Sequence, residues 1–350
     1  MKITEPTFII NKNRVINNID KMIARAELFD ADLRPHFKTH QSVEIGELFR
    51  ERGITKITVS SVSMAEYFAT NGWADITIAF PVNLLQIKQI NTLAKNIKLN
   101  ILVDSVFSAQ SLSNFITRSL GVFIKVDTGY HRSGISFDDP EIEKIINEIK
   151  QNRFLKLKGF LTHAGNTYNA KGKNEIEKIV ADSYSQLKVL KSKYPNTIIS
   201  WGDTPSCSIA ENLDEFDELR PGNFVYYDVM QYHIGSCKME EIAVVVACPV
   251  VSVYPEREEM IIYGGGIHFS KEFIAADNDF KLYGYVVKLE NGNWETPIAG
   301  AYVSSISQEH GIIKMPNNQI TDFKPGDLIG VLPIHSCLTA NLLKGNSINR

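Results

Sequence analysis

The sequence predicts an α/β fold, an eight-stranded (β/α)8 TIM barrel, followed by an all-β C-terminal domain. From about residue 14 to 235, short β-branched runs alternate with segments of helical periodicity, as in β/α units built on a parallel sheet. Eight such units in roughly 220 residues fit a closed barrel better than an open doubly wound sheet. After Tyr232, valine-, isoleucine- and tyrosine-rich runs separated by turn residues indicate an all-β domain.

The helices of the barrel are predicted from apolar residues that recur at helical spacing. The first is NRVINNIDKMIARAEL, and the second covers about residues 43–52 and ends at Gly53. Ser63 with Glu66 three positions later forms a capping box, which predicts the start of a third helix that ends at Gly72. Two later helices are expected in DPEIEKIINEIKQN and NEIEKIVADSYSQLKVLKSK.

The strands of the barrel are predicted in eight short runs. They are DLRPHF, TKITVSS, DITIAF, LNILVDS, GVFIKVDT, LKGFLTHA, TIISWGD and NFVYYDV. We therefore expect the barrel over residues 14–235. Residues 236–350 form the β domain, to which residues 1–13 add an N-terminal strand from PTFIIN.

Composition argues against several classes of partner. The net charge of -3 and the pI of about 6.3 argue against nucleic acid and anionic membranes, so a small-molecule partner is expected. The four cysteines are few and scattered, which indicates a reducing compartment. The N-terminus has no apolar core of signal-peptide length, and the longest apolar run, from Ile242, is too short to span a bilayer. We expect a cytoplasmic protein.

Polar, glycine-rich motifs follow the predicted strands: HFKTH, VDTGYHRSG, THAGNTY, WGDTPS and LRPGNF. The carboxyl ends of barrel strands converge on one face, so these motifs would surround one site. Lys38 can be a solvated surface lysine, or a desolvated lysine that forms a Schiff base with a carbonyl. WGDTPS and RPGN can be tight turns, or can supply phosphate ligands at the last strand ends. A Schiff-base lysine opposite a phosphate cradle suggests pyridoxal phosphate.

Two histidines flank this lysine at alternating positions. On an extended strand end, His36, Lys38 and His40 would point to one face. Either histidine can then take part in proton transfer or in tuning the chemistry of the site, or can be a structural histidine with satisfied hydrogen bonds.

The segment LPIHSCL contains His335 and Cys337 two positions apart, so their side chains point the same way on an extended segment. Imidazole and thiolate together suit zinc, although a bare His-x-Cys pattern is usually coincidence. Two protein ligands would leave open positions for a substrate hydroxyl, as in a catalytic site.

Six motifs, RPHFKTH, VDTGYHRSG, THAGNTY, ELRPGNFVYYD, SQEHG and PIHSC, resemble in order the D-threonine aldolase and eukaryotic-type D-serine dehydratase family. The resemblance covers nearly the whole chain and implies pyridoxal phosphate enzymes with an alanine-racemase-like barrel and a C-terminal β domain. It implies that Lys38 is the Schiff-base lysine, that Arg132 contacts the cofactor ring oxygen, and that Tyr168 or Arg220 is the partner of the ring nitrogen, with Tyr168 favoured. The residues implied to hold the phosphate are Gly202, Thr204, Gly222 and Asn223.

The resemblance also implies that His335 and Cys337 bind a divalent metal, with zinc favoured and manganese or magnesium as alternatives. It places residues 308–310 near the site, where we expect a contact to a metal ligand. The chain departs from the family pattern in YGGGIHFSKE, where His268 can supply a compensating polar group, and at Asn166, where the family often has histidine. Both departures bear on which substrate is accepted.

The implied activity is a lyase reaction on a D-amino acid with a 3-hydroxyl, in a homodimer. The cysteine ligand favours the D-serine dehydratase reaction, which gives a keto acid and ammonia. The alternatives are D-threonine aldolase cleavage to glycine and an aldehyde, an amino-acid racemase, and a non-enzymatic pyridoxal phosphate carrier. Metal content separates the lyases from the last two.

Overall fold

A computed structural model describes residues 3–275 and 280–349. The chain divides into two compact units, which we describe separately. One comprises Asp20–Gly222, and the other combines the described residues up to Ile19 with those from Asn223 onward. No helix among the described residues has the length and apolar character needed to cross a bilayer.

The unit Asp20–Gly222 is built on eight parallel strands, which neighbour one another in the order β2, β9, β8, β7, β6, β5, β4 and β3. A parallel bridge between His36 and Thr58 joins the two end strands, and the Phe37 N–H donates to the Thr58 carbonyl at 2.9 Å. The sheet is therefore a nearly closed barrel, as predicted. The strands are β2 (Asp32–Leu33), β3 (Lys56–Val59), β4 (Asp75–Pro81), β5 (Lys98–Val103), β6 (Leu120–Lys125), β7 (Leu155–Leu161), β8 (Ile198–Trp201) and β9 (Glu218–Leu219).

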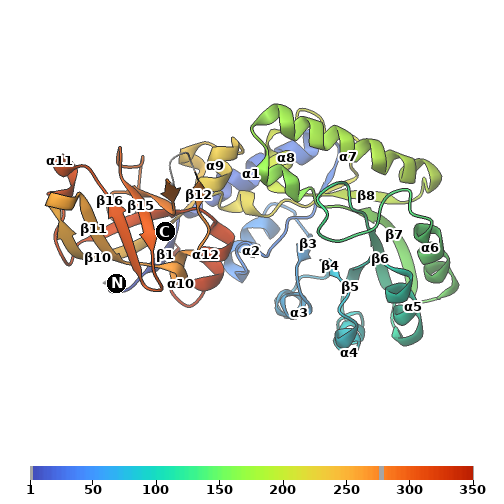
Figure 1. Cartoon of the computed structure of the whole chain (residues 1–350). Coiled ribbons are helices and arrows are strands. Elements are labelled where there is room, and N and C mark those ends of the chain that lie inside the picture. Colours follow the sequence, from blue (N-terminus) through green and yellow to red (C-terminus); the bar gives the residue numbers. More distant parts are fainter. Residues whose placement is uncertain (1–2, 276–279, 350) are drawn as a thin grey trace. The chain divides into compact units, whose positions relative to one another are not determined.

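Helices follow the strands in sequence, and Figure 1 shows α3 to α7 on the outer side of the curved sheet. In α6, Ile142, Ile145, Ile146 and Ile149 are buried, which is the helical spacing of one apolar face. The helices are α1 (Lys12–Leu28), α2 (Val43–Arg50), α3 (Val62–Thr70), α4 (Ile87–Leu93), α5 (Val106–Phe115), α6 (Glu141–Gln151), α7 (Lys173–Lys193) and α8 (Thr204–Ile209), with the 3-10 helices η1 (Leu84–Gln86) and η2 (Gly165–Asn169).

Two local predictions are wrong. The eighth strand is β9 rather than NFVYYDV, because Pro221 has no N–H to continue a ladder and Asn223–Val225 forms the 3-10 helix η3 instead. The third helix begins at Val62 rather than after Ser63. The hydroxyl of Ser61 caps it by accepting the Met64 N–H at 3.1 Å.

The second unit contains an antiparallel barrel. Strand β10 pairs with β17 through one part of its length and with β11 through another, which closes the order β11, β16, β15, β14, β17, β10. Strand β1 extends the sheet from β10 and pairs in parallel with β18. The strands are β1 (Thr7–Ile10), β10 (Val244–Tyr254), β11 (Glu259–Tyr263), β14 (Gly284–Val287), β15 (Tyr302–Ile306), β16 (His310–Lys314), β17 (Leu328–Pro333) and β18 (Ser347–Asn349), with a separate pair β12 (Ile274–Ala275) and β13 (Lys281–Leu282).

Short helices, which periodicity did not predict, connect these strands. Among them, α12 follows β17 directly and therefore starts within the His-x-Cys motif. The helices are α9 (Val229–Ile234), α10 (Gly266–Phe269), α11 (Asn317–Ile320) and α12 (Ser336–Leu342), with the 3-10 helices η4 (Met239–Glu241) and η5 (Pro255–Arg257).

Candidate active site

Lys38 lies in a turn that follows the His36 bridge, and its side chain is exposed. The Lys38 N–H donates to Nδ1 of His36 at 3.3 Å, which holds the His36 side chain against this turn. The expectation that His40 shares their face is wrong, because the chain turns here instead of staying extended. The His40 ring is buried, 4.4 Å from the ring of Phe37 and stacked on Phe49 at 6.0 Å.

Several basic groups lie near one another at the strand ends around Lys38. Burial of its ring, followed by the charges of Lys38 and Arg220, lowers the pKa of His36 well below the usual range. Burial and the Lys38 charge likewise lower the pKa of His163, whose Nδ1–H donates to the Gly202 carbonyl at 2.6 Å. The charge of Arg132 also lowers the pKa of both imidazoles. Both histidines are therefore neutral at pH 7 and lie in a positive field that attracts anions.

Lys125 adds a buried amine to this region, and sequence reasoning missed it. It is the last residue of β6, and its Nζ donates to the Val126 carbonyl at 2.9 Å. Burial, helped by Arg220 and opposed by Asp127, lowers the pKa of Lys125 to about 7. The available signal was a lysine that ends an otherwise apolar strand immediately before VDTG.

Three of the predicted phosphate ligands, Gly202, Thr204 and Gly222, follow the ends of β8 and β9. A Cβ atom on Gly202 would lie 2.9 Å from the Arg220 backbone, so glycine is required for this close approach. The Thr204 N–H donates to the Tyr168 hydroxyl at 3.5 Å. Thr204 Oγ1 is buried and has no hydrogen-bond partner among the described residues, so a ligand oxygen can satisfy it.

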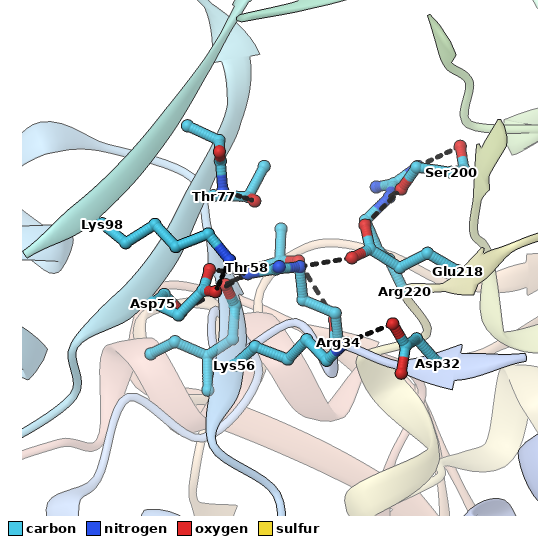
Figure 2. Close-up of polar contacts among 12 residues, drawn as sticks. Asp32, Arg34, Lys56, Thr58, Asp75, Thr77, Lys98, Ser200, Glu218 and Arg220 are labelled. Carbon is cyan, nitrogen blue, oxygen red and sulfur yellow. Dashed lines mark hydrogen bonds and ion pairs between the residues drawn. The ribbon is translucent and has the colours of Figure 1, made fainter. Parts of the chain in front are cut away.

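A network of buried polar side chains in the barrel unit anchors the side chain of Arg220, as Figure 2 shows. Its Nε donates to Ser200 Oγ at 2.6 Å and its Nη2 donates to the Thr162 carbonyl at 2.5 Å. The Ser200 hydroxyl in turn donates to Glu218 at 2.6 Å, and Glu218 accepts from Arg34 at 2.5 Å. The network fixes the Arg220 guanidinium and uses its Nε and Nη2 donors against the barrel wall.

The side chain of Asn223 contacts the His-x-Cys segment within the second unit. Its Nδ2 donates to Asp228 Oδ2 at 2.6 Å and to the Cys337 sulfur at 3.5 Å. The same Asp228 oxygen accepts the Ser336 N–H at 2.9 Å. The Asn223 side-chain donor is therefore used here, which leaves only its backbone N–H for the predicted phosphate contact. Asn223 Oδ1 is buried without a partner among the described residues.

His335 and Cys337 lie together, and Cys337 hydrogen-bonds to the imidazole. The His335 Nδ1 also lies 2.5 Å from Oε2 of Glu272. Burial lowers the pKa of His335, but the contacts with Cys337 and Glu272 outweigh it and raise that pKa to about 11 in the metal-free protein. Within residues 3–275 and 280–349, no group of three or more His, Cys, Asp or Glu side chains is arranged to hold a metal. The protein would thus supply two ligands here.

Among the described residues, no hydrogen bond joins residues 308–310 to His335 or Cys337, so the contact to a metal ligand that we expected stays a prediction. Residues 308–310 are exposed at the β15–β16 connection, and the carbonyls of Gln308 and Glu309 accept from Ile267 and Gly264. In the described structure the carboxylate that contacts His335 is instead Glu272, within the departing segment YGGGIHFSKE.

His268, proposed to compensate for that departure, is buried. Its Nδ1 accepts the Gly265 N–H at 3.1 Å, and its ring packs edge-on against Tyr263. Its described contacts are therefore with its own segment.

Comparisons with known proteins identify the family of this chain. Residues 10–229 match the family model "Alanine racemase, N-terminal domain", and residues 243–346 match a serine dehydratase domain. The D-serine dehydratase of Dictyostelium discoideum is 31% identical, over 96% of this chain and 90% of that protein. The D-threo-3-hydroxyaspartate dehydratase of Delftia sp. is also 31% identical, over 95% and 91%.

Solved structures show the same architecture. The Delftia dehydratase superimposes with a TM-score of 0.89 at 29% identity, over 97% of this chain and 93% of that one. The D-threonine aldolase of Filomicrobium marinum shares the fold, with a TM-score of 0.81 at 19% identity over 96% and 89%. The chain therefore belongs to the D-serine dehydratase and D-threonine aldolase family of pyridoxal phosphate lyases, which have the alanine-racemase-like fold.

Proposed function

We propose that this protein is a metal-dependent dehydratase that converts D-serine, or a close D-3-hydroxy amino acid, into a 2-oxo acid and ammonia. The observation that carries the proposal is the contact between His335 and Cys337, because an imidazole and a thiolate form a ligand pair suited to zinc. Two relatives at 31% identity are dehydratases, whereas the D-threonine aldolase of Arthrobacter is 23% identical over 98% of this chain and 88% of that protein.

The residues around Lys38 fit pyridoxal phosphate. A positive field from Lys38, Arg132 and Arg220 suits an anionic cofactor and a substrate carboxylate, and the Thr204 hydroxyl is an unsatisfied donor for a phosphate oxygen. Lys38 would carry the cofactor through its amine, and Gly202, Thr204, Gly222 and Asn223 would hold the phosphate, the last through its backbone N–H. When bound, the cofactor supplies an electron sink that stabilises negative charge at the substrate Cα.

Around the cofactor, Arg132 would contact the ring oxygen and Tyr168 the ring nitrogen. Support for Tyr168 comes from Arg220, whose Nε and Nη2 already donate to Ser200 and Thr162. The uncharged hydroxyl of a tyrosine leaves the ring nitrogen less positive than a guanidinium does, so the choice affects reactivity. The groups proposed to accept the Cα proton are the Lys38 amine, when it does not carry the cofactor, and the neutral imidazole of His36.

The metal would be held by His335 Nε2 and Cys337 Sγ, with zinc favoured because thiolate is a soft ligand and manganese or magnesium as the harder alternatives. Its role would be to bind the substrate 3-hydroxyl and stabilise departing hydroxide. A cysteine-to-alanine variant of a D-threo-3-hydroxyaspartate dehydratase that is 29% identical to this chain has been solved in a metal-free form.

We also propose a cytoplasmic homodimer, from the family resemblance and from the four cysteines, none of which forms a disulfide within the described residues. Light scattering of the purified protein tests the homodimer, and a monomer at micromolar concentration would contradict it.

The reaction is tested by product analysis with D-serine, D-threonine and D-alanine. We expect a 2-oxo acid and ammonia from D-serine, in amounts that match. Glycine and an aldehyde from D-threonine, with no product from D-serine, would establish the aldolase. Interconversion of D- and L-alanine without elimination would establish a racemase, and no turnover together with stoichiometric bound cofactor would favour a carrier.

A further inference from the structure

The carboxylate of Glu272 lies 2.5 Å from Nδ1 of His335, although the two residues are 63 positions apart in the chain. Glu272 lies between α10 and β12, and His335 is the residue immediately before α12. Both side chains are partly exposed, 45% for Glu272 and 32% for His335, so the contact can be reached from solvent. Both residues belong to the same compact unit.

A histidine ligand uses one ring nitrogen for the metal, and a hydrogen bond at the other nitrogen decides which one. Because the Glu272 oxygen accepts from Nδ1, the proton resides on Nδ1 in the neutral ring and the Nε2 lone pair is left for a cation. The carboxylate also increases the basicity of the imidazole and limits rotation of the ring.

The other predicted ligand has a partner of its own. The Cys337 sulfur accepts from Asn223 Nδ2 at 3.5 Å, and Asp228 holds that amide at 2.6 Å. Asp228 is 1% exposed and also accepts from the N–H and hydroxyl of Ser336, between the two ligands. Each ligand side chain is thus oriented by a separate polar group, which is the usual construction around a metal.

We propose that Glu272 is a positioning residue for the metal site, which orients His335 so that Nε2 binds the metal. The proposal rests on the proposed function, because it requires a metal at His335 and Cys337. It assigns a role to the segment YGGGIHFSKE, where the sequence departs from its family pattern.

The test is the affinity of the purified protein for zinc, measured by competition with a chromophoric chelator. Glu272→Ala should weaken zinc binding about 10- to 100-fold. Glu272→Gln keeps an acceptor oxygen but loses the charge, so it should cause a smaller loss. Glu309→Gln is the matched control, because this exposed carboxylate belongs to the same unit and contacts neither ligand in the described structure. It should bind zinc as the parent does.

A readout independent of affinity is the tautomer of His335 in the zinc-loaded protein, obtained from a long-range proton–nitrogen spectrum. The parent and Glu309→Gln should carry the proton on Nδ1, and Glu272→Ala should lose this preference. Cofactor absorbance should be the same in all four proteins, and the metal-free variants should unfold at midpoints close to that of the parent because the Glu272–His335 pair is partly exposed. These two measurements separate an effect on the metal from misfolding.

A failure of the role proposed for Glu272 can be distinguished from a failure of the metal-dependent function. Zinc affinity within twofold of the parent in Glu272→Ala, together with an unchanged tautomer, overturns the role of Glu272 and leaves the metal site standing. A parent protein that binds no stoichiometric zinc overturns the metal-dependent function and the inference together.

Discussion

His40 should make the barrel unit sensitive to mild acid. Its ring is buried among Phe37, Phe49 and Phe68, and its Nε2 has no hydrogen-bond partner among the described residues. Burial lowers the pKa of His40 to about 3, although a hydrogen bond with the Ser42 backbone acts in the opposite direction. The folded protein therefore keeps this ring neutral over a pH range in which the unfolded chain protonates it.

The magnitude follows from the difference between the two pKa values. An unfolded histidine has a pKa of about 6.5, so between pH 6.5 and 3 the unfolded state holds a proton that the folded state lacks. The free energy of unfolding then falls by about 1.4 kcal/mol per pH unit as pH decreases. At pH 5 the loss from this residue is about 1.5 units times 1.36, or about 2 kcal/mol, and above pH 6.5 there is none.

Urea unfolding at pH 7.5 and pH 5.0, followed by tryptophan fluorescence, measures this loss in the parent and in His40→Phe. Phenylalanine fills the aromatic cluster without a titratable group, so the parent should lose about 2 kcal/mol more than the variant between the two pH values. His36 and His163 titrate in the same direction but are present in both proteins, so they cancel. His131→Gln, at a side chain that is 84% exposed, is the control and should behave as the parent. Equal losses in the parent and His40→Phe would refute the reasoning.

Three further predictions concern the barrel network and the proposed ligands. Glu218→Gln removes a buried charge that pairs with Arg34, at side chains 2% and 6% exposed, and should lower the free energy of unfolding by about 3–5 kcal/mol in urea titrations. Lys98→Ala, at the exposed end of the same network, should lower the free energy of unfolding by less than about 1 kcal/mol. A loss as large as that of Glu218→Gln would contradict this prediction. Borohydride should fix the cofactor to the peptide that contains Lys38, as mass spectrometry can show, and fixation at another lysine would exclude this role. Cys337→Asp should shift metal preference from zinc toward manganese or magnesium in competition titrations, and an unchanged preference would show that the sulfur is not a ligand.

The barrel could be predicted from sequence because most of its strands lie in short β-branched runs and its longer helices have an apolar face such as that of α6. The eighth strand could not, because Phe224, Val225 and Tyr226 are buried and apolar in a 3-10 segment, and burial alone does not specify an extended backbone. The predicted direction of the His40 side chain was wrong for a related reason. Alternation predicts a shared face only if the chain stays extended, and here it turns.

The pair of candidate metal ligands was predictable because its residues are close in sequence. His335 and Cys337 are two positions apart, and the structure brings their side chains together. The contact between Glu272 and His335 depends on how the β domain folds, so no local pattern indicates it. Lys125 was missed although it ends an otherwise apolar strand, because a lysine at a strand end is usually exposed and its burial becomes visible only in the structure.

The central claim, a metal-dependent dehydratase, is tested most directly by measuring keto acid and ammonia from D-serine before chelation, after chelation and after zinc is restored. The account predicts equal amounts of the two products from the metal-loaded protein, none after chelation, and recovery with zinc. The cofactor absorbance should stay nearly unchanged throughout, because the proposed ligands of the cofactor do not include His335 or Cys337. Undiminished elimination in protein shown to be free of metal would contradict the account.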